Sequence, residues 1–225
     1  MKTNNEFEFK GLVINGFLAI ILCLALLACA VYCMVLADNQ GIFALLGGLL
    51  MVLFIICANG FIKLEPNEAK VMVFFGKYEG TFSKTGFHWA NPLLSKKGVS
   101  LRARNLNPEP IKVNDKAGNP ILIGMVLVWK LEDTYKALFE IDSQSLALVP
   151  GQGARAATRQ LSLAFENFVR VQSDAALRQV AGNYAYDNAT SENELTLRSN
   201  ADEINEQLVS TLNDRLSMAG IHVME

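Results

Sequence analysis

Charged side chains are missing from two long stretches near the start of this 225-residue chain. Residues 12–37 and residues 41–62 contain no Asp, Glu, Lys or Arg, and only three polar residues, 38–40, separate them. As helices, these 26 and 22 residues would reach roughly 39 and 33 Å, and the hydrocarbon core of a bilayer is about 30 Å thick. The sequence therefore predicts two transmembrane helices, 12–37 and 41–62, joined as a hairpin.

A signal peptide or a soluble core helix accounts less well for these apolar stretches. A cleaved signal peptide has an apolar core of roughly 7–15 residues, and the first stretch is longer and is followed at once by a second. A buried helix that is apolar on every side would need a far larger soluble protein around it. A shallow hairpin that enters and leaves one leaflet remains an alternative, because the connecting turn is so short.

Lysines flank the predicted hairpin, whereas its turn has neither Lys nor Arg. They are Lys2 and Lys10 before it and Lys63, Lys70 and Lys77 after it. By the positive-inside rule, both flanks are expected in the cytoplasm. Residues 1–11 are thus predicted to be a cytoplasmic tail, and residues 63–225 a cytoplasmic domain.

The soluble part has no cysteine and little histidine. All four cysteines, Cys23, Cys29, Cys33 and Cys57, lie in the apolar stretches, which suits a reducing compartment. The two histidines, His88 and His222, are far apart, and a zinc site typically needs four ligands. No nucleophile elbow or phosphate-binding loop is present either. We therefore expect no catalytic, metal or cofactor site.

Small residues recur along both apolar stretches. Four of them, spaced by four residues, form a strip on the first stretch, and two more form a similar strip on the second: Ala25, Cys29, Cys33 and Ala37, then Ala44 and Gly48. Small side chains let helix backbones approach closely in lipid. We expect these strips to face each other or a neighbouring subunit.

A small, largely antiparallel β lobe is predicted for residues 63–131. A strand is expected at 70–76 from its β-branched and aromatic content. Another is expected at 99–106 from its partial alternation, with Arg102 and Arg104 sharing one face. Residues 114–120 have the composition of a hairpin turn. The strand that follows, 121–131, is expected to be the most buried.

Helical patterns dominate residues 132–225. Helices are expected at 133–139 behind an acidic cap, at 154–183 with a possible break at Ser173, and at 200–218. The expected buried face of the second helix comprises Ala157, Leu161, Ala164, Phe168, Val171 and Ala175, and that of the third comprises Ile204, Leu208, Leu212 and Leu216. Gly220 is a helix stop before a strand at 221–224. The predicted fold class is α+β.

Positive charge is concentrated next to the hairpin. Residues 63–116 hold 10 Lys and Arg against 5 Asp and Glu, whereas residues 117–225 hold 8 against 14. Anionic headgroups attract a nearby cation by about 1 kcal/mol, so the basic lobe is expected to contact the membrane surface, although a solvated face without a lipid role is an alternative. The candidate contacts are Lys63, Lys70, Lys77, Lys84, Lys96, Lys97 and the interfacial aromatic Trp89.

Several consecutive segments carry a family resemblance. They are EPNEA at 65–69, VMVFFGKYEGT, GFHWANP, SLRARN, KVNDKAGNPI, VWKLED, VQSDAALRQVAGNYAYD and ELTLRSNADEINEQL. Over residues 62–225 the chain resembles bacterial SPFH (Band 7; stomatin-, prohibitin- and flotillin-like) proteins, and the preceding hairpin is similar to that of one subgroup. Residues 143–163 look like an insertion. Relatives also continue past the last strand into a long coiled-coil helix, so we expect a truncated or unusually short member.

The resemblance implies a mixed α/β domain against the membrane, ring or cage homo-oligomers, and organisation of membrane patches or of a partner protease. It implies no catalytic residue, no cofactor and no nucleic-acid partner. The expected function is a membrane-anchored scaffold in the cell membrane, here a bacterial inner membrane, with a membrane protease as one candidate partner. The alternative is a regulatory module for one membrane enzyme or channel, without extended assembly.

Overall fold

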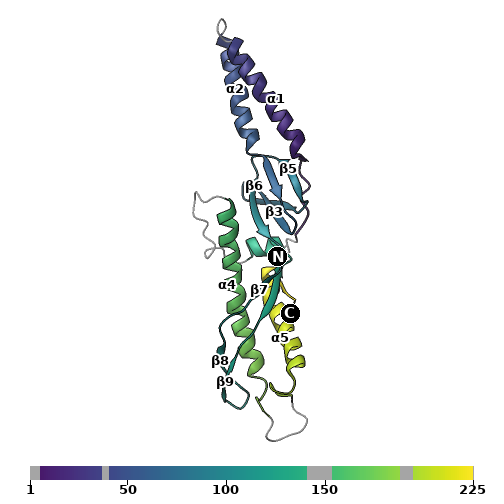
Figure 1. The fold of residues 1–225 in the computed structure, drawn as a ribbon, viewed down its shortest axis with the longest axis vertical. Helices are drawn as coiled ribbons and strands as arrows, with labels where there is room; N and C mark the ends of the chain where they lie inside the picture. The colour runs from purple at the N-terminus through teal and green to yellow at the C-terminus, as the bar shows by residue number, and fades with distance from the viewer. Residues whose placement is uncertain (1–5, 37–40, 141–153, 188–194, 225) are drawn as a thin grey trace. The chain divides into compact units, whose positions relative to one another are not determined.

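The computed structural model describes residues 6–36, 41–140, 154–187 and 195–224 (Figure 1). The chain forms two compact units. The N-terminal unit comprises residues 7–98, and the C-terminal unit comprises Glu6 together with the described residues from Val99 onward.

Two apolar helices begin the N-terminal unit and pack side by side (Figure 1). Helix α1 spans Gly16–Val35 and helix α2 spans Gly41–Ala58. The Asn15 side chain caps α1 by accepting a hydrogen bond from the Phe17 amide at 2.9 Å. Both helices are shorter than the apolar stretches, because the flanking residues form strands β1, Val13–Asn15, and β2, Phe61–Leu64.

Two three-stranded sheets complete this unit. Strands β3 to β6 span Glu68–Phe74, Lys77–Phe82, Gly86–Ala90 and Ser95–Ser100. One sheet has the order β1-β5-β2 and the other the order β4-β3-β6. A core formed by Ile62, Leu64, Met72, Phe82 and Ala90 is buried between them. Because β1 precedes α1 and β2 and β5 follow α2, one sheet joins both flanks of the helix pair.

The C-terminal unit holds a second β structure. Strands β7 to β11 span Arg104–Leu106, Ile111–Asn114, Pro120–Ile123, Leu127–Leu131 and Ile221–Val223. Strands β11, β10 and β7 form an antiparallel sheet, and β8 and β9 form the predicted hairpin.

Two strand predictions need correction. The strand expected at 99–106 is interrupted, since β6 ends at Ser100 and β7 begins at Arg104, so Arg102 lies in neither strand. The strand expected at 121–131 is divided into β9 and β10, and only β10 is well buried. Leu122 in β9 is 72% exposed, because β9 pairs only with β8 and no layer covers its outer face.

Three helices belong to this unit. They are α3, Thr134–Phe139; α4, Ala154–Ala181; and α5, Ala201–Leu216, which a short 3₁₀ turn, η3, Ser217–Ala219, continues. The Asp133 side chain caps α3 by accepting from the Lys136 amide at 3.0 Å. Gly220 stops the last turn with a φ of +62°, and a side chain there would collide with the Asp133 backbone. Both local predictions are confirmed.

The buried face of α4 lies about one residue from the predicted one. Its buried residues are Leu161, Phe165, Val169, Ser173, Ala176, Leu177, Val180 and Ala181, whereas Val171 is exposed. The helix continues through Ser173 because its hydroxyl donates within the helix, to the carbonyls of Val169 at 2.7 Å and Arg170 at 2.9 Å. A satisfied serine can occupy a buried stripe. The predicted α+β fold class, with two apolar helices first, is confirmed.

Candidate membrane-anchoring site

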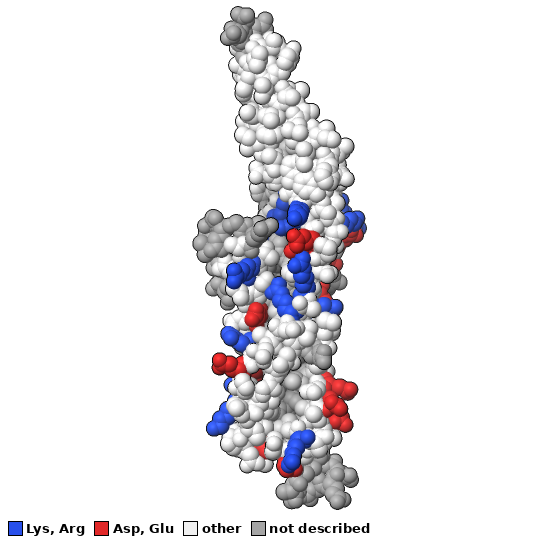
Figure 2. Space-filling model, in the orientation of Figure 1, with Lys and Arg blue, Asp and Glu red and all other residues white. Residues whose placement is uncertain are grey.

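The surface of the α1–α2 pair is apolar and open. Both helices are long and apolar enough to cross a bilayer. Only 11% of the most apolar 18-residue stretch of α1 is buried, and only 6% of that of α2. Figure 2 shows no charged atom on the visible face of this helix pair, and Lys and Arg atoms begin where the helices end. An exposed apolar surface of this extent marks an interaction site rather than a water-facing surface. The helix pair therefore indicates association with a membrane.

The seam between α1 and α2 is built around Gly47. A Cβ at Gly47 would lie 2.8 Å from Met34 Cγ and 3.1 Å from the Ala30 carbonyl oxygen, so the hydrogen side chain permits this close approach. Among the less exposed residues, one set on each helix recurs at alternating spacings of three and four: Ala19, Cys23, Leu26, Ala30 and Cys33 on α1, and Phe43, Gly47, Leu50, Phe54 and Cys57 on α2. This repeat keeps one face of each helix toward its partner.

The small-residue strips predicted from the sequence do not meet within the hairpin. Ala25, Cys29 and Ala44 are exposed, and nothing lies within 4 Å of a Cβ built on Gly48. Cys33 is partly buried in the seam, and Ala37 lies outside the described residues. A row with a strict spacing of four winds away from a straight seam, because each step turns about 40°. Contact of these strips with a neighbouring subunit stays a prediction.

Trp89 fastens β5 to the end of α2. Its indole nitrogen Nε1 donates a hydrogen bond to the Cys57 carbonyl oxygen at 2.8 Å. Gly60 makes room, since a side chain there would collide with the indole. The last carbonyls of a helix lack the usual helical partner, and the Cys57 carbonyl accepts here from both the Gly60 amide, at 2.9 Å, and the Trp89 indole. The sequence marked Trp89 as interfacial but could not identify this partner.

Lys96 closes the same helix end. Its Nζ donates to the carbonyl oxygens of Asn59 and Gly60, each at 3.0 Å, and a cation at this position also complements the helix dipole. Burial lowers the pKa of Lys96, and the positive charge of Lys70 lowers it further. This predicted surface lysine is thus half-buried and directed at the backbone.

An aromatic cluster holds the start of α1. Phe87 in β5 lies edge-on to Phe17, with ring centroids 5.6 Å apart, and is stacked on Phe61 at 5.5 Å. Gly16, the first residue of α1, lies against the Phe87 ring, and a side chain there would collide with it. Aromatic pairs contribute about 0.5–1.5 kcal/mol beyond their buried area, so both helices are fixed to the same sheet.

The other predicted surface lysines are placed more loosely. Three have exposed ammonium groups beside acids: Lys63 with Glu65 at 3.9 Å, Lys77 with Glu79 at 2.9 Å and Lys84 with Glu8 at 3.3 Å. Lys70 and Lys97 are partly buried. Exposed pairs contribute only about 0–1 kcal/mol, so these lysines are available to the solvent side. Contact of this set with headgroups stays a prediction.

The segment before α1 is tied to strands that follow α2. The Phe9 amide donates to the Thr81 carbonyl at 3.0 Å, the Thr81 amide donates to the Phe7 carbonyl at 2.9 Å, and Ile14 pairs with Trp89 in the β1–β5 ladder. Both flanks of the helix pair therefore lie at the same end of it. Sequence reasoning missed these pairings, because the residues at 12–15 read as a continuation of the apolar helix.

Glu6 makes a second contact that the sequence did not indicate, within the C-terminal unit. Its carboxylate accepts hydrogen bonds from the Thr134 amide at 3.1 Å and from the Thr134 hydroxyl at 2.8 Å. Thr134 is buried at the first turn of α3, where helix amides need acceptors. No local pattern could have identified a partner so far away in the chain.

Within the described ranges, no group of three or more His, Cys, Asp or Glu side chains could hold a metal ion. His88 lies in β5 and His222 in β11, which belong to different sheets. What the N-terminal unit offers is an apolar helix pair locked to a small β structure with exposed lysines.

Comparison with known proteins agrees with this geometry. No match was found among curated proteins. The family model of the SPFH domain / Band 7 family matches residues 62–225, which is well over half of the sequence and begins inside β2. The chain belongs to the SPFH domain / Band 7 family.

Proposed function

We propose that this protein is a membrane-anchored scaffold whose copies associate laterally to organise membrane patches or partner membrane proteins, including a membrane protease. The family is known for membrane scaffolding. The observation that carries the proposal is the locked junction, in which Trp89 in β5 and Lys96 in β6 hold the end of α2 to the two sheets of the unit. A scaffold needs such a junction, because a loose anchor would not transmit the arrangement of its soluble units to the bilayer.

In this proposal α1 and α2 span the bilayer as a hairpin and the β structure lies at the headgroups. The β1–β5 pairing brings both flanks to one end of the helix pair, which favours a hairpin over two independent anchors. Lysines on both flanks favour the cytoplasmic side. In this arrangement Trp89 would lie at the level where interfacial tryptophans concentrate, and Lys63, Lys77 and Lys84 would approach anionic lipid.

Size measurement of the full chain in a mild detergent tests lateral assembly. Light scattering after gel filtration should give a mass of many copies. A monomer would contradict the scaffold, and a fixed complex with one co-purifying membrane enzyme would favour a regulatory module instead. The apolar helix surface by itself would give detergent binding in each case, so the protein mass must be separated from the detergent mass.

Cysteine labelling in intact cells tests the topology. In a chain without native cysteines, Lys10→Cys and Lys77→Cys should both resist an impermeant maleimide until the cells are opened. Asn39→Cys, in the expected turn, should react from outside. Reaction of Lys10→Cys and Lys77→Cys on opposite sides would overturn the hairpin, and protection of Asn39→Cys in intact cells would indicate the shallow alternative.

A further inference from the structure

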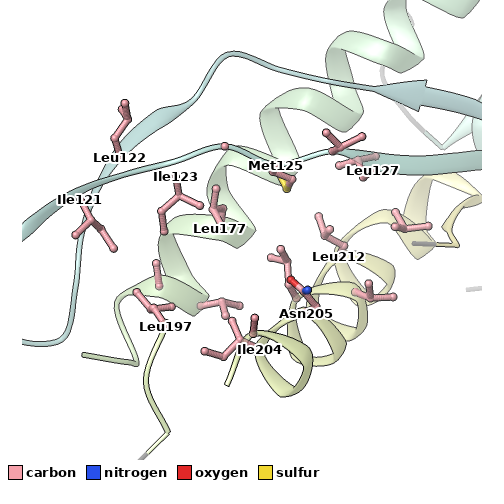
Figure 3. Close-up of a pocket in the computed structure, with 18 of the residues that line it drawn as sticks. Ile121, Leu122, Ile123, Met125, Leu127, Leu177, Leu197, Ile204, Asn205 and Leu212 are labelled. Atoms are coloured by element: carbon pink, nitrogen blue, oxygen red, sulfur yellow. The ribbon is translucent and has the colours of Figure 1, made fainter. Parts of the chain in front are cut away.

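An apolar groove lies in the C-terminal unit, between the β9–β10 strand and helices α4 and α5 (Figure 3). Its cavity volume is about 510 Å³. The walls are branched and aliphatic, and include Ile121, Ile123, Met125, Leu177, Ile204 and Leu212. Asn205 is the labelled polar side chain that points into the same space (Figure 3). Such a cavity accepts apolar side chains rather than a charged ligand.

The outer face of the strand that forms one wall is also apolar. Leu122 is 72% exposed and Val126 is 66% exposed. Both residues also border the groove, but exposure alternates along this segment: Ile121, Ile123 and Met125 are partly buried and the even-numbered residues are exposed, which places the even-numbered side chains on the outer face. Figure 3 shows Leu122 pointing away from the helices. We call Leu122 and Val126 the outer pair; the segment 121–126, which begins in β9 and ends just before β10, thus carries a groove wall on one side and two exposed aliphatic side chains on the other.

The lengths of the two surfaces match. At about 3.3 Å per residue, the outer pair is separated by roughly 13 Å. Along α5 the groove runs from Ala201 to Leu212, which at about 1.5 Å per residue is roughly 16 Å. Gly124 lies between the two side chains and presents none of its own. Two aliphatic side chains at this separation can therefore enter the groove together.

Charge is complementary as well. Lys112 is directly opposite Leu122 in the β8–β9 register and is exposed, so it lies on the same outer face. Asp202 and Glu206 are exposed on α5, one turn apart. Helix periodicity places them beside Asn205 and Val209, which line the groove. A basic side chain thus accompanies the outer pair, and an acidic rim borders the cavity.

The β8–β9 hairpin is held in position before any contact forms. Asp115 Oδ1 accepts from the Asn119 amide at 2.7 Å, and its Oδ2 accepts from the Tyr186 amide at 3.2 Å. The Lys116 amide donates to the Tyr184 carbonyl at 3.0 Å. These bonds tie the turn to the segment after α4, and a pre-organised surface loses less entropy on binding.

We propose that the groove receives the outer pair of a second copy of this chain, with Lys112 of that copy beside Asp202 and Glu206. The inference rests on the proposed lateral association and specifies its contact. Because the inserting face and the receiving groove are different surfaces, the contact is heterologous. It repeats from copy to copy and produces a ring or an open row rather than a closed pair.

A pair of cysteines tests this contact in membranes. We would combine Leu122→Cys with Val209→Cys in a chain whose four native cysteines are alanine, and use each single variant as a control. Mild oxidation should give a ladder of covalent oligomers only with the double variant. Each single variant should stay monomeric on a denaturing gel, since a heterologous contact brings unlike positions together.

The results that would contradict this contact can be told apart from one another. A dimer from Leu122→Cys alone would show a symmetric contact and overturn the inference. A large particle in detergent without a ladder would also overturn it, while the scaffold proposal would stand. Cross-linking of Val209→Cys to a different protein would assign the groove to another occupant. A monomer in detergent would remove the scaffold proposal and this contact together.

Charge reversal gives a second measurement on the same double-cysteine chain. Lys112→Glu should reduce the cross-linked fraction by about threefold, in line with the modest energy of an exposed ion pair. Adding Asp202→Lys and Glu206→Lys should restore it. Lys130, on β10, serves as the control; its ammonium group lies 3.1 Å from the Glu132 carboxylate. If Lys130→Glu reduced the cross-linked fraction as much as Lys112→Glu, a specific role for Lys112 would be contradicted.

Discussion

The indole N–H of Trp89 donates a hydrogen bond to the Cys57 carbonyl oxygen at 2.8 Å, and so joins a sheet residue to the end of an apolar helix. Lys96 in β6 binds the Asn59 and Gly60 carbonyls just past α2, so the end of this helix is bonded to both sheets of the unit. Substitutions at this junction should therefore weaken the attachment of α2 to the β structure while the rest of the chain stays folded.

Trp89→Phe should keep an aromatic ring but lose this hydrogen bond, so that the Gly60 amide, at 2.9 Å, is the donor that the Cys57 carbonyl keeps. We expect a loss of about 1 kcal/mol in unfolding free energy, measured by thermal unfolding of the detergent-solubilised chain. Tyr186→Phe, at an exposed ring in the C-terminal unit, is the control and should change stability by less than about 0.5 kcal/mol. Equal effects of the two substitutions would argue against a fastening role for Trp89.

Lys96→Met should keep the alkyl stem and remove the donor to Asn59 and Gly60. A loss of about 1–2 kcal/mol is expected, because the ammonium group is only half-buried. The lowered pKa of folded Lys96 means that the folded chain releases this proton before the unfolded chain does. Stability of the parent relative to Lys96→Met should therefore rise with pH in the window below about 10.4. A difference that fell with pH would contradict this assignment.

Gly47→Leu and Gly48→Leu form a matched pair of adjacent substitutions. Gly47→Leu should separate α1 from α2 by collision with Met34 and Ala30, with a cost of about 1–3 kcal/mol. Gly48→Leu enters open space and should leave thermal stability unchanged. If the outward strip contacts another subunit, Gly48→Leu should still reduce the particle size in detergent. Equal destabilisation by both would show that the seam is not centred on Gly47.

Glu6→Ala should loosen the start of α3, because the Thr134 amide and hydroxyl lose their acceptor. The expected loss is about 1 kcal/mol, as for removal of a helix cap. Glu8→Ala, which removes only the exposed pair with Lys84, should cost less than about 0.5 kcal/mol. Hydrogen exchange in α3 is the measurement; unchanged exchange in Glu6→Ala would contradict the contact.

Asp115→Ala should release the turn of the β8–β9 hairpin. Burial raises the pKa of Asp115, but hydrogen bonds from the Asn119 and Tyr186 amides outweigh it and leave the pKa below its ordinary value. Stability from this carboxylate is thus present above about pH 3.9 and lost as the pH falls toward the folded pKa. Exchange of the Tyr186 amide should accelerate in acid for the parent chain and at neutral pH for Asp115→Ala. Protection that is independent of pH in the parent would oppose this role.

Features with local causes were predictable from the sequence. The Asp133 cap and the Gly220 stop depend on a few neighbouring residues, and both are found where expected. The length and lack of charge of the two apolar stretches predicted the helix pair for the same reason. Site residues that depend on distant partners were harder to predict. The sequence marks Lys96 as a surface cation, and only the fold brings it to its carbonyl partners.

The faces of helices were predicted less well. In α4 the serine at 173 suggested a possible break of the helix, yet its hydroxyl is satisfied inside the helix and the residue is fully buried. In the helix pair, the strip of small residues through Cys29 predicts a close contact on its own face, whereas Gly47 makes the close approach between α1 and α2. Which side of a helix is buried depends on the neighbouring elements, and the composition of one helix does not specify these.

The pairing of Val13 with Ala90 has a consequence for biosynthesis. Strand β1 emerges from the ribosome before α1, but its partner β5 is made only after α2. At about 5–20 residues per second, β1 must wait several seconds for that partner. In the proposed hairpin topology the sheet could close only after the chain had returned to the side from which it entered, so a completed sheet would report correct insertion.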